Sequence, residues 1–353
     1  MTPRQRLAWV AAAGFVMVFG LGELARWILE SVRGPSWWAI DLNLVLRAGQ
    51  RLETGGQLYS DPAYLYPPAA AVIGAALGWL DPFVLSLVWA ILKLGVVAGA
   101  VHRLTPTWRP GDRVPAALAV GTCLPFLHDL FLGNVNTLLV AAVAVAAFGR
   151  PSPRSGIALG VLAAVFAKPL LLPIGLWLLV FRRSTLTGTI AAGLVTTALG
   201  VVVAGPAAYL AWPGALTGGE RFASSFAGNH GVSALLPEAW LPVAALTGIA
   251  LLFVLARRNG QIGLVWATTS GILIAPYAGT YSALPIVLAV AVIGPMAPRL
   301  ALVIVALSPV ATTYPLPFYA ASILGAVLAV REPSAPAGVP AGPPKTATSV
   351  SNW

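Results

Sequence analysis

The segment LAWVAAAGFVMVFGLGELARWIL, residues 7–29, decides the class of fold, because it is a long and mainly apolar run near the start of the chain. A run of this length crosses the hydrocarbon core of a bilayer as one helix. It is longer than the apolar region of a signal peptide, and no convincing cleavage site follows it. We therefore expect a first membrane helix here, with Arg4 and Arg6 on the inner side.

The rest of the chain has the composition of a polytopic membrane protein. Of its 353 residues 58% are apolar and 9% are charged, which is too much apolar surface for a soluble domain. The apolar runs suit α-helices, because backbone polar groups in lipid must be satisfied within the segment, and they lack the alternation of barrel strands. The formal charge of +10 comes from scattered basic residues, not from the stripe that binds nucleic acid. The sequence predicts an all-α polytopic membrane protein with no nucleic-acid partner.

The basic clusters between apolar runs predict the topology. Cytoplasmic clusters must be separated by an even number of crossings. This gives about twelve transmembrane helices with both termini in the cytoplasm, the further spans lying near residues 82–101, 114–132, 135–149, 155–168, 169–181, 184–204, 240–256, 261–277, 282–296, 299–311 and 316–330. The short run 67–80 is interpreted as re-entrant or interfacial, and the short pair around Lys168 as a hairpin that does not fully cross.

The same pattern divides the chain into regions. Residues 1–331 form the expected transmembrane domain, with residues 30–67 as its first extracytoplasmic loop. Residues 332–353 are rich in Pro, Ala, Gly and Ser, and are expected to be a disordered cytoplasmic tail. The sequence specifies no oligomeric state.

The first extracytoplasmic loop contains an amphipathic segment that begins at Asp41. Apolar residues of this segment fall on one helical face and polar ones on the other, which predicts a helix at the membrane interface. Asp41 has two interpretations: an N-cap of that helix, which local sequence favours, or a catalytic base.

An aromatic stretch, GGQLYSDPAYLYPP, follows at residues 55–68. Its tyrosines, Tyr59 and Tyr66 among them, could pack on a sugar ring or a lipid headgroup. The alternative is an ordinary interfacial aromatic belt.

Several motifs occur in an order that resembles one known family. They are the Asp of the first loop, then GGQLY, YPP, GNVN at residues 133–136, AKPLLLP followed by RR, and GNHGVSALLP from residue 228. Together they are similar to glycosyltransferase family 87, polyprenyl-phosphate-sugar-dependent enzymes of the GT-C class, many of them mannosyltransferases. The resemblance implies a GT-C fold with a cavity open to the extracytoplasmic side.

The resemblance also implies roles for residues. Asp41 matches the expected general base, which would take a proton from a sugar hydroxyl in an inverting displacement. The leaving polyprenyl phosphate needs cationic or N–H partners, for which Lys168 is the better candidate and Arg221 and Arg47 the weaker ones. A snorkelling lysine and solvated arginines are the alternatives.

Further polar residues fall near these motifs. His128 and Asp129 close an apolar run before GNVN, where they contact the acceptor or pair with each other and the turn. Asn134 and Asn136 hydrogen-bond a sugar or cap the turn. Asn229 and His230 lie in the largest later loop, with His230 a departure from the family pattern and a candidate acceptor or phosphate contact. Tyr281 lies at an external turn where several relatives carry a His or an acid.

No Cys/His cluster, paired-carboxylate motif or Gly-rich nucleotide fingerprint indicates a metal or a bound cofactor. The expected partners are membrane lipids, a polyprenyl-phosphate sugar as donor substrate, and a glycolipid or lipoglycan acceptor. The resemblance, with the charge pattern, therefore implies a plasma-membrane glycosyltransferase with an extracytoplasmic active site. Mannose is the expected donor sugar, and arabinofuranose is the close alternative.

Two other classes of protein fit the sequence less well. A transporter or flippase would favour repeated halves with interrupted helices at matching positions, and this chain shows no internal repeat. A non-catalytic assembly subunit is the other alternative. Neither class requires an acid at Asp41.

Overall fold

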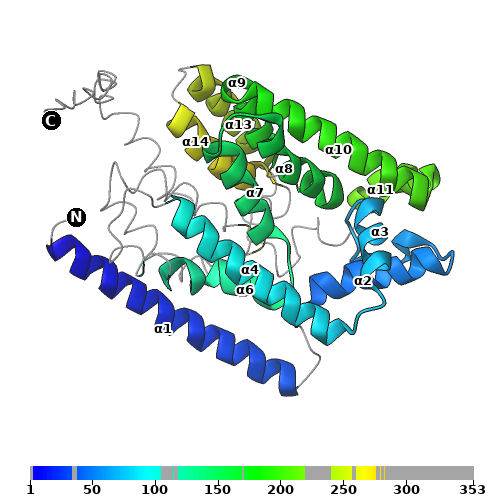
Figure 1. The fold of residues 1–353 in the computed structure, drawn as a ribbon, viewed down its shortest axis with the longest axis horizontal. Helices are drawn as coiled ribbons and strands as arrows, with labels where there is room; N and C mark the ends of the chain where they lie inside the picture. The colour runs from blue at the N-terminus through cyan, green and yellow to red at the C-terminus, as the bar shows by residue number, and fades with distance from the viewer. Residues whose placement is uncertain are drawn as a thin grey trace, which may run out of the picture.

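The computed structural model of the protein describes residues 3–33, 38–104, 114, 118–168, 171–218, 240–256, 260–275, 279 and 282. Every regular element within these ranges is helical, as Figure 1 shows. In chain order the elements are α1 (Pro3–Arg33), α2 (Ile40–Glu53), η1 (Leu58–Ser60), α3 (Pro68–Leu77), α4 (Pro82–Leu104), α6 (Leu124–Leu132), α7 (Asn136–Phe148), α8 (Pro153–Phe166), α9 (Leu172–Phe181), α10 (Arg183–Ala204), α11 (Pro206–Gly218), α13 (Trp240–Ala256) and α14 (Gly260–Ile274). The predicted all-α class is confirmed for this part of the chain.

Three of the described helices are long and apolar enough to cross a bilayer. The membrane-length segments are Val10–Glu30 in α1, Pro82–Gly99 in α4 and Arg183–Ala204, which is α10. Many of their large apolar side chains are exposed, Val18 and Val202 among them, which fits contact with lipid. These helices support a membrane protein, whereas the predicted count of about twelve spans is not confirmed.

The predicted span 114–132 differs from the structure in shape. Its second half is α6, and the chain then turns by 119° into α7, so that these two helices form one broken span or a re-entrant pair. Gly133 permits this turn because it adopts a left-handed conformation, with φ of 69°. The predicted pair of short spans around Lys168 corresponds to α8 and α9, which are both shorter than a bilayer-spanning helix.

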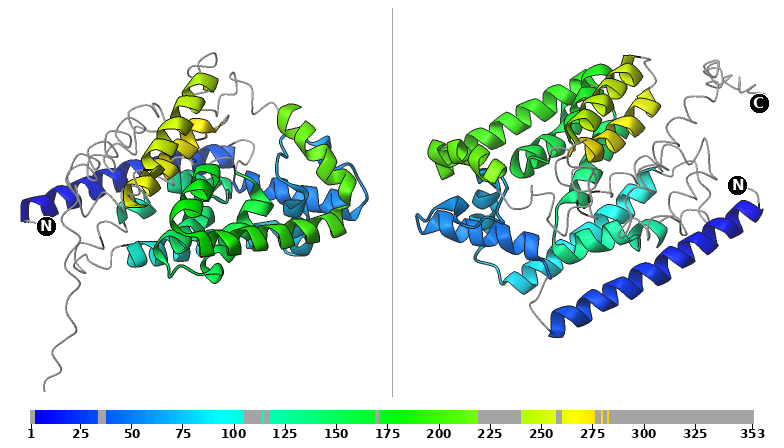
Figure 2. Two further views of the ribbon diagram at one scale, coloured as in Figure 1. Left: turned by 90° about the horizontal axis from the view of Figure 1, so that it is seen from above. Right: turned by 180° about the vertical axis from the view of Figure 1, so that it is seen from behind.

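The helices form two groups that meet around α7. In Figures 1 and 2, α8, α9, α10, α13 and α14 lie together, while α1 runs along the opposite edge beside α6. Helix α7 contacts both α4 and α8, so it connects the two groups. Helices α2 and α3 pack on each other, and α3 also contacts α10.

Glycines let the backbones of packed helices approach each other. At the α2–α3 crossing a Cβ atom on Gly74 would overlap the carbonyl oxygen of Val45, and one on Gly49 would overlap the backbone of Ala75. At the α8–α10 crossing a Cβ on Gly188 would overlap the backbone of Pro153. Small residues at helix crossings are the usual device for packing in membranes, where the hydrophobic effect does not drive association.

Several predictions fall outside the described residues. These are the last three spans, the tail 332–353 and most of the largest later loop. A helix does occupy the predicted amphipathic segment, and Arg47 and Gln50 on its predicted polar face are exposed. Its location at a membrane interface stays a prediction.

The α2–α3 crossing gives a stability test. Gly74→Ala should lower the free energy of unfolding by about 1–3 kcal/mol, because the added methyl group collides with the Val45 carbonyl and forces the helices apart. Gly95→Ala in α4 is the control, since a Cβ there meets nothing within 4 Å. Thermal or denaturant unfolding in detergent measures both. Equal stability of the two variants would show that this crossing is not tightly packed.

Candidate active site

Helix α2 begins against the turn that joins α6 to α7. The backbone N–H of Ala39 donates to the carbonyl oxygen of Phe131 at 2.8 Å, and Ala39 itself adopts a left-handed conformation with φ of 54°. Such a conformation costs a non-glycine residue of order 1 kcal/mol or more, so the surrounding contacts must impose it. Gly133 lies against it, because a Cβ on Gly133 would come within 3.0 Å of the Ala39 Cα.

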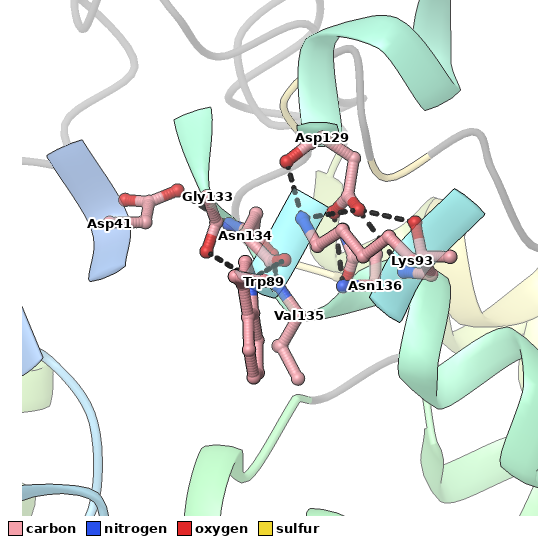
Figure 3. A network of polar contacts seen from close by, with 9 residues as sticks. Asp41, Trp89, Lys93, Asp129, Gly133, Asn134, Val135 and Asn136 are labelled. Carbon is pink, nitrogen blue, oxygen red and sulfur yellow. Dashed lines mark hydrogen bonds and ion pairs between the residues drawn. The ribbon is translucent and has the colours of Figure 1, made fainter. Parts of the chain in front are cut away.

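This close approach brings Asp41 to the GNVN turn. Asp41 is 4% exposed, and its Oδ2 accepts a hydrogen bond of 2.6 Å from Nδ2 of Asn134. The interpretation of Asp41 as the N-cap of its helix is wrong, because α2 begins at Ile40 and Ala39 holds the cap position. The carboxylate instead contacts a residue that lies far along the chain (Figure 3).

Asn134 is held in a single orientation by the turn. Its Oδ1 accepts from the backbone N–H of Val135 at 2.7 Å, and its own backbone N–H donates to the carbonyl oxygen of Asp129 at 3.0 Å. Because Oδ1 faces an N–H donor, the amide must present Nδ2 to Asp41. Asn134 is therefore a neutral donor that orients the Asp41 carboxylate.

Asp129 supports the start of α7. Its Oδ1 accepts from the N–H of Asn136 at 3.0 Å, and its Oδ2 accepts from the N–H of Thr137 at 3.3 Å and from the Thr137 hydroxyl. These are the first N–H groups of α7, which have no partner within their own helix. A carboxylate at this end is also favoured by the helix dipole. Asp129 thus joins α6 to α7 across the bend.

Lys93 of α4 completes this network, and sequence reasoning missed it. Its Nζ lies 3.0 Å from Asp129 Oδ2 and donates to the Asp129 carbonyl oxygen at 2.7 Å. Both side chains are 0% exposed. The signal was available, because a single lysine inside the apolar run of α4 is a costly residue that needs a partner.

Two tryptophans connect α4 to the same region. Trp89 Nε1 donates to the carbonyl oxygen of Gly133 at 3.1 Å, and Figure 3 shows its indole beside the turn. Trp38, two residues before the start of α2, donates from its indole Nε1 to the Ser86 hydroxyl at 3.0 Å. Helix α4 therefore contacts both the turn and the start of α2.

The aromatic loop forms a second cluster. The hydroxyls of Tyr59 and Tyr64 donate to the carbonyl oxygens of Tyr66 and Pro67, each at 3.1 Å. Burial raises the pKa of both Tyr59 and Tyr64 above the usual range of a phenol, so both remain protonated donors. Nζ of Lys168 lies 5.5 Å from the centre of the Tyr66 ring, within the range of a cation–π contact.

The other candidates lie elsewhere or outside the described residues. Both Arg47 and Arg51 of α2 approach Asp61: their Nη2 atoms lie 3.8 and 3.3 Å from its Oδ2. The His128 ring packs against the ring of Trp27 in α1, with centroids 5.0 Å apart, while Asp129 pairs with Lys93. Four candidates fall outside the described residues: Arg221, Asn229, His230 and Tyr281.

The structure thus brings together Asp41, Asn134, Asn136 and Asp129 in one network, and Tyr59, Tyr66 and Lys168 in another. Contact of any of them with a sugar or a phosphate stays a prediction. No group of three metal-ligating side chains occurs among the described residues, and the expectation of a metal-free site also stays a prediction.

Comparison with known proteins gives one family and a distant relative. The model of "Glycosyltransferase family 87" matches residues 64–331, well over half of the chain. An "Alpha-(1->3)-arabinofuranosyltransferase" of Corynebacterium glutamicum is 26% identical over 258 residues, which cover 66% of this chain and 61% of the relative. The chain thus spans about three fifths of the length of that relative, and no solved structure matches. The family match begins after Asp41. The assignment of Asp41 as a site residue therefore rests on its geometry and on the motif of the first loop.

The Asp41–Asn134 contact can be measured by a double-mutant cycle on stability. Asn134→Leu should lower the free energy of unfolding by about 1–3 kcal/mol, because it leaves the buried Asp41 carboxylate without this donor. The loss should be smaller in an Asp41→Leu background, where the amide has no acceptor to lose. Asn43→Leu on the half-buried side of α2 is the control. Additive effects of the Asp41 and Asn134 changes would show that the two side chains are not coupled.

Proposed function

Because the chain belongs to glycosyltransferase family 87 and is therefore a glycosyltransferase, we propose that it moves a sugar from a polyprenyl-phosphate donor to a lipid-linked glycan. The observation that carries the proposal is the buried Asp41 carboxylate, held at the GNVN turn by a neutral amide. Family membership also places the chain among enzymes rather than transporters or flippases.

Asp41 is the proposed general base. The hydrogen bond from Asn134 orients the Asp41 carboxylate, and an oriented carboxylate can take the proton of an acceptor hydroxyl. In the same cluster Asp129 pairs with Lys93 and accepts the N–H of Asn136 at the start of α7. Two acids in one cluster with different partners are suited to different roles.

The reaction is a single displacement at the anomeric carbon. The acceptor hydroxyl oxygen forms a bond to this carbon while the bond from the carbon to the phosphate oxygen breaks. The hydroxyl proton passes to Asp41, and the electron pair of the broken bond leaves with the polyprenyl phosphate. Attack from the face opposite the leaving group inverts the configuration of the sugar.

Lys168 is the proposed partner of the departing phosphate. It follows directly on the end of α8, where Ala167 is the C-cap in a left-handed conformation. Its cation lies over Tyr66 in a half-buried position, which supports an ammonium group that has given up part of its water. Such a group interacts strongly with the charge that develops on the leaving oxygen.

We place the site on the extracytoplasmic side of the plasma membrane. The support is the charge bias of the sequence, with Arg4 and Arg6 before the first span and α2 after it. Donors on a lipid phosphate suit this side, where nucleotide sugars are not supplied.

Mannose is the first donor sugar to test, and arabinofuranose is the second. Mannose follows from the resemblance of the motifs to the mannosyltransferases of the family. Arabinofuranose is favoured by the name of the Corynebacterium glutamicum relative. Both fit the same displacement, because each would be carried on the same kind of lipid phosphate.

The base assignment is tested by transfer activity. Asp41→Asn should reduce the turnover number by about 100-fold or more, because the amide cannot take the proton of the acceptor hydroxyl. Purified protein is given radiolabelled polyprenyl-phosphate mannose or polyprenyl-phosphate arabinofuranose with glycolipid acceptors, and the labelled glycolipid is counted.

Asp81→Asn is the matched control, since Asp81 binds the N–H groups of Phe83 and Val84 at the start of α4. Equal transfer by wild type and Asp41→Asn would exclude Asp41 as the base. Transfer from neither donor by the wild type would overturn the proposed substrate class.

The role of Lys168 is tested separately. Lys168→Met should raise the KM for the donor by about 10- to 100-fold, because the loss of one charge-assisted contact costs about 1.5–3 kcal/mol. Lys168→Arg keeps the charge and should retain most of the affinity for the donor. The kinetics are measured at varied donor and fixed acceptor concentration. A change confined to the KM for the acceptor would contradict the phosphate assignment.

A further inference from the structure

Three ionisable side chains are buried together near the turn. Asp41 is 4% exposed, while Asp129 and Lys93 are 0% exposed. Lys93 carries the opposite charge to Asp129, and the two form an ion pair in which Nζ lies 3.0 Å from Oδ2. Removal of the lysine would leave two buried carboxylates of like charge.

A continuous chain of contacts leads from Lys93 to Asp41. Lys93 binds both the carboxylate and the carbonyl oxygen of Asp129. That same carbonyl oxygen accepts the backbone N–H of Asn134, whose side chain donates to Asp41. The position of the base therefore depends on a lysine from a different helix through only two intermediate residues.

We propose that Lys93 is a positioning residue for the catalytic base, through the turn that presents Asn134 to Asp41. The inference rests on the proposed role of Asp41 as the base. The lysine neutralises Asp129 and anchors the backbone of the turn. Asp41 is then both oriented and left as the charged carboxylate that accepts the proton.

Two simpler roles for Lys93 are less well supported. Direct contact with the substrate does not fit a side chain that is fully buried and bound twice to Asp129. A role in stability alone does not explain the charges, because a well-packed apolar pair often serves the fold as well as a buried ion pair. The specific effect of this pair is on the turn and on the charge beside Asp41.

The experiment compares Lys93→Met, Asp129→Asn and the double variant Lys93→Met/Asp129→Asn in the full-length protein. Methionine preserves the length of the lysine side chain without its charge. Asparagine keeps an oxygen that can accept the N–H of Asn136. Val143→Ala is the control for general destabilisation, because it removes packing inside the same α7 helix away from the charges. The turnover number and KM are measured with the donor that the wild type uses.

Lys93→Met should reduce the turnover number by about 100-fold, because a displaced base loses its alignment with the acceptor, and should change KM by less than about threefold. The double variant should recover at least about tenfold of this loss, because it no longer has a second, unpaired carboxylate at Asp129 beside Asp41. Val143→Ala should keep the turnover number close to wild type. The difference in turnover number between Lys93→Met and Val143→Ala separates a positioning role from a general loss of stability.

Three outcomes would overturn the proposal. The first is a Lys93→Met variant with at least half of the wild-type turnover while Asp41→Asn is inactive. The second is a double variant as inactive as Lys93→Met although its melting temperature has recovered. The third is a Lys93→Met variant in which KM rises and the turnover number does not change, which would indicate direct contact with the substrate. Each can occur with the proposed function intact, which Asp41→Asn tests on its own.

Two further measurements test the proposal if the Lys93→Met protein does not fold or if the wild type shows no transfer. Trp89→Phe keeps an aromatic ring but removes the indole N–H that binds the carbonyl oxygens of Gly133 and Asn134, and it should lower the turnover number by about tenfold at unchanged KM. Infrared spectra at neutral pH need no activity. The double variant should show no stronger band of protonated carboxyl groups than the wild type. Lys93→Met should gain one such band, and Lys93→Gln replaces it if Lys93→Met does not fold. Adding Asp41→Asn to the lysine variant should remove the new band. Unchanged turnover in Trp89→Phe, or no new band, would overturn the proposal.

Discussion

A helix that begins inside the protein leaves its first backbone N–H groups without partners, and at α7 one carboxylate supplies them. Asp129 binds the N–H groups of Asn136 and Thr137, so the chain turns by 119° between α6 and α7 while these two N–H groups stay hydrogen-bonded. Such groups cost several kcal/mol each in hydrocarbon. The buried charge in turn requires Lys93, which ties the bend to α4. The remaining contacts of the site depend on this arrangement.

The bend presents Asn134 at a place that α2 can reach. The left-handed backbone at Ala39 and Gly133 brings the two segments into contact, and the Ala39 N–H closes the approach by binding the Phe131 carbonyl. Asp41 then meets a neutral amide, while Asp129 meets a cation. In the proposed mechanism Asp41 accepts the proton, while Asp129 holds the bend. In a displacement at an anomeric carbon the position of the base matters as much as its charge.

Prediction succeeded where a pattern reports local physics. The apolar runs gave α1, α4 and α10 as membrane-length helices, because helix formation in lipid depends on the composition of the segment itself. The predicted spans 114–132 and 135–149 are separated at GNVN, and the chain does bend there, although the structure has a bent pair of shorter helices at this place. The predicted number of membrane spans is not confirmed where the apolar runs are short, as at α8 and α9. Length alone does not say whether such a helix crosses, turns back or packs inside the protein.

The sequence by itself determined the helical membrane class, the glycosyltransferase resemblance and the presence of Asp41 in the first loop, since composition and motif order are properties of the chain. Only the tertiary structure decided what Asp41 contacts. Asn134 is distant in sequence, and the helix cap that local pattern favours proved to be Ala39. Lys93 was visible as a lone lysine in an apolar run, but its partner on another helix was not. Buried polar groups choose partners through the packing of helices, and that packing is written in no local stretch of sequence.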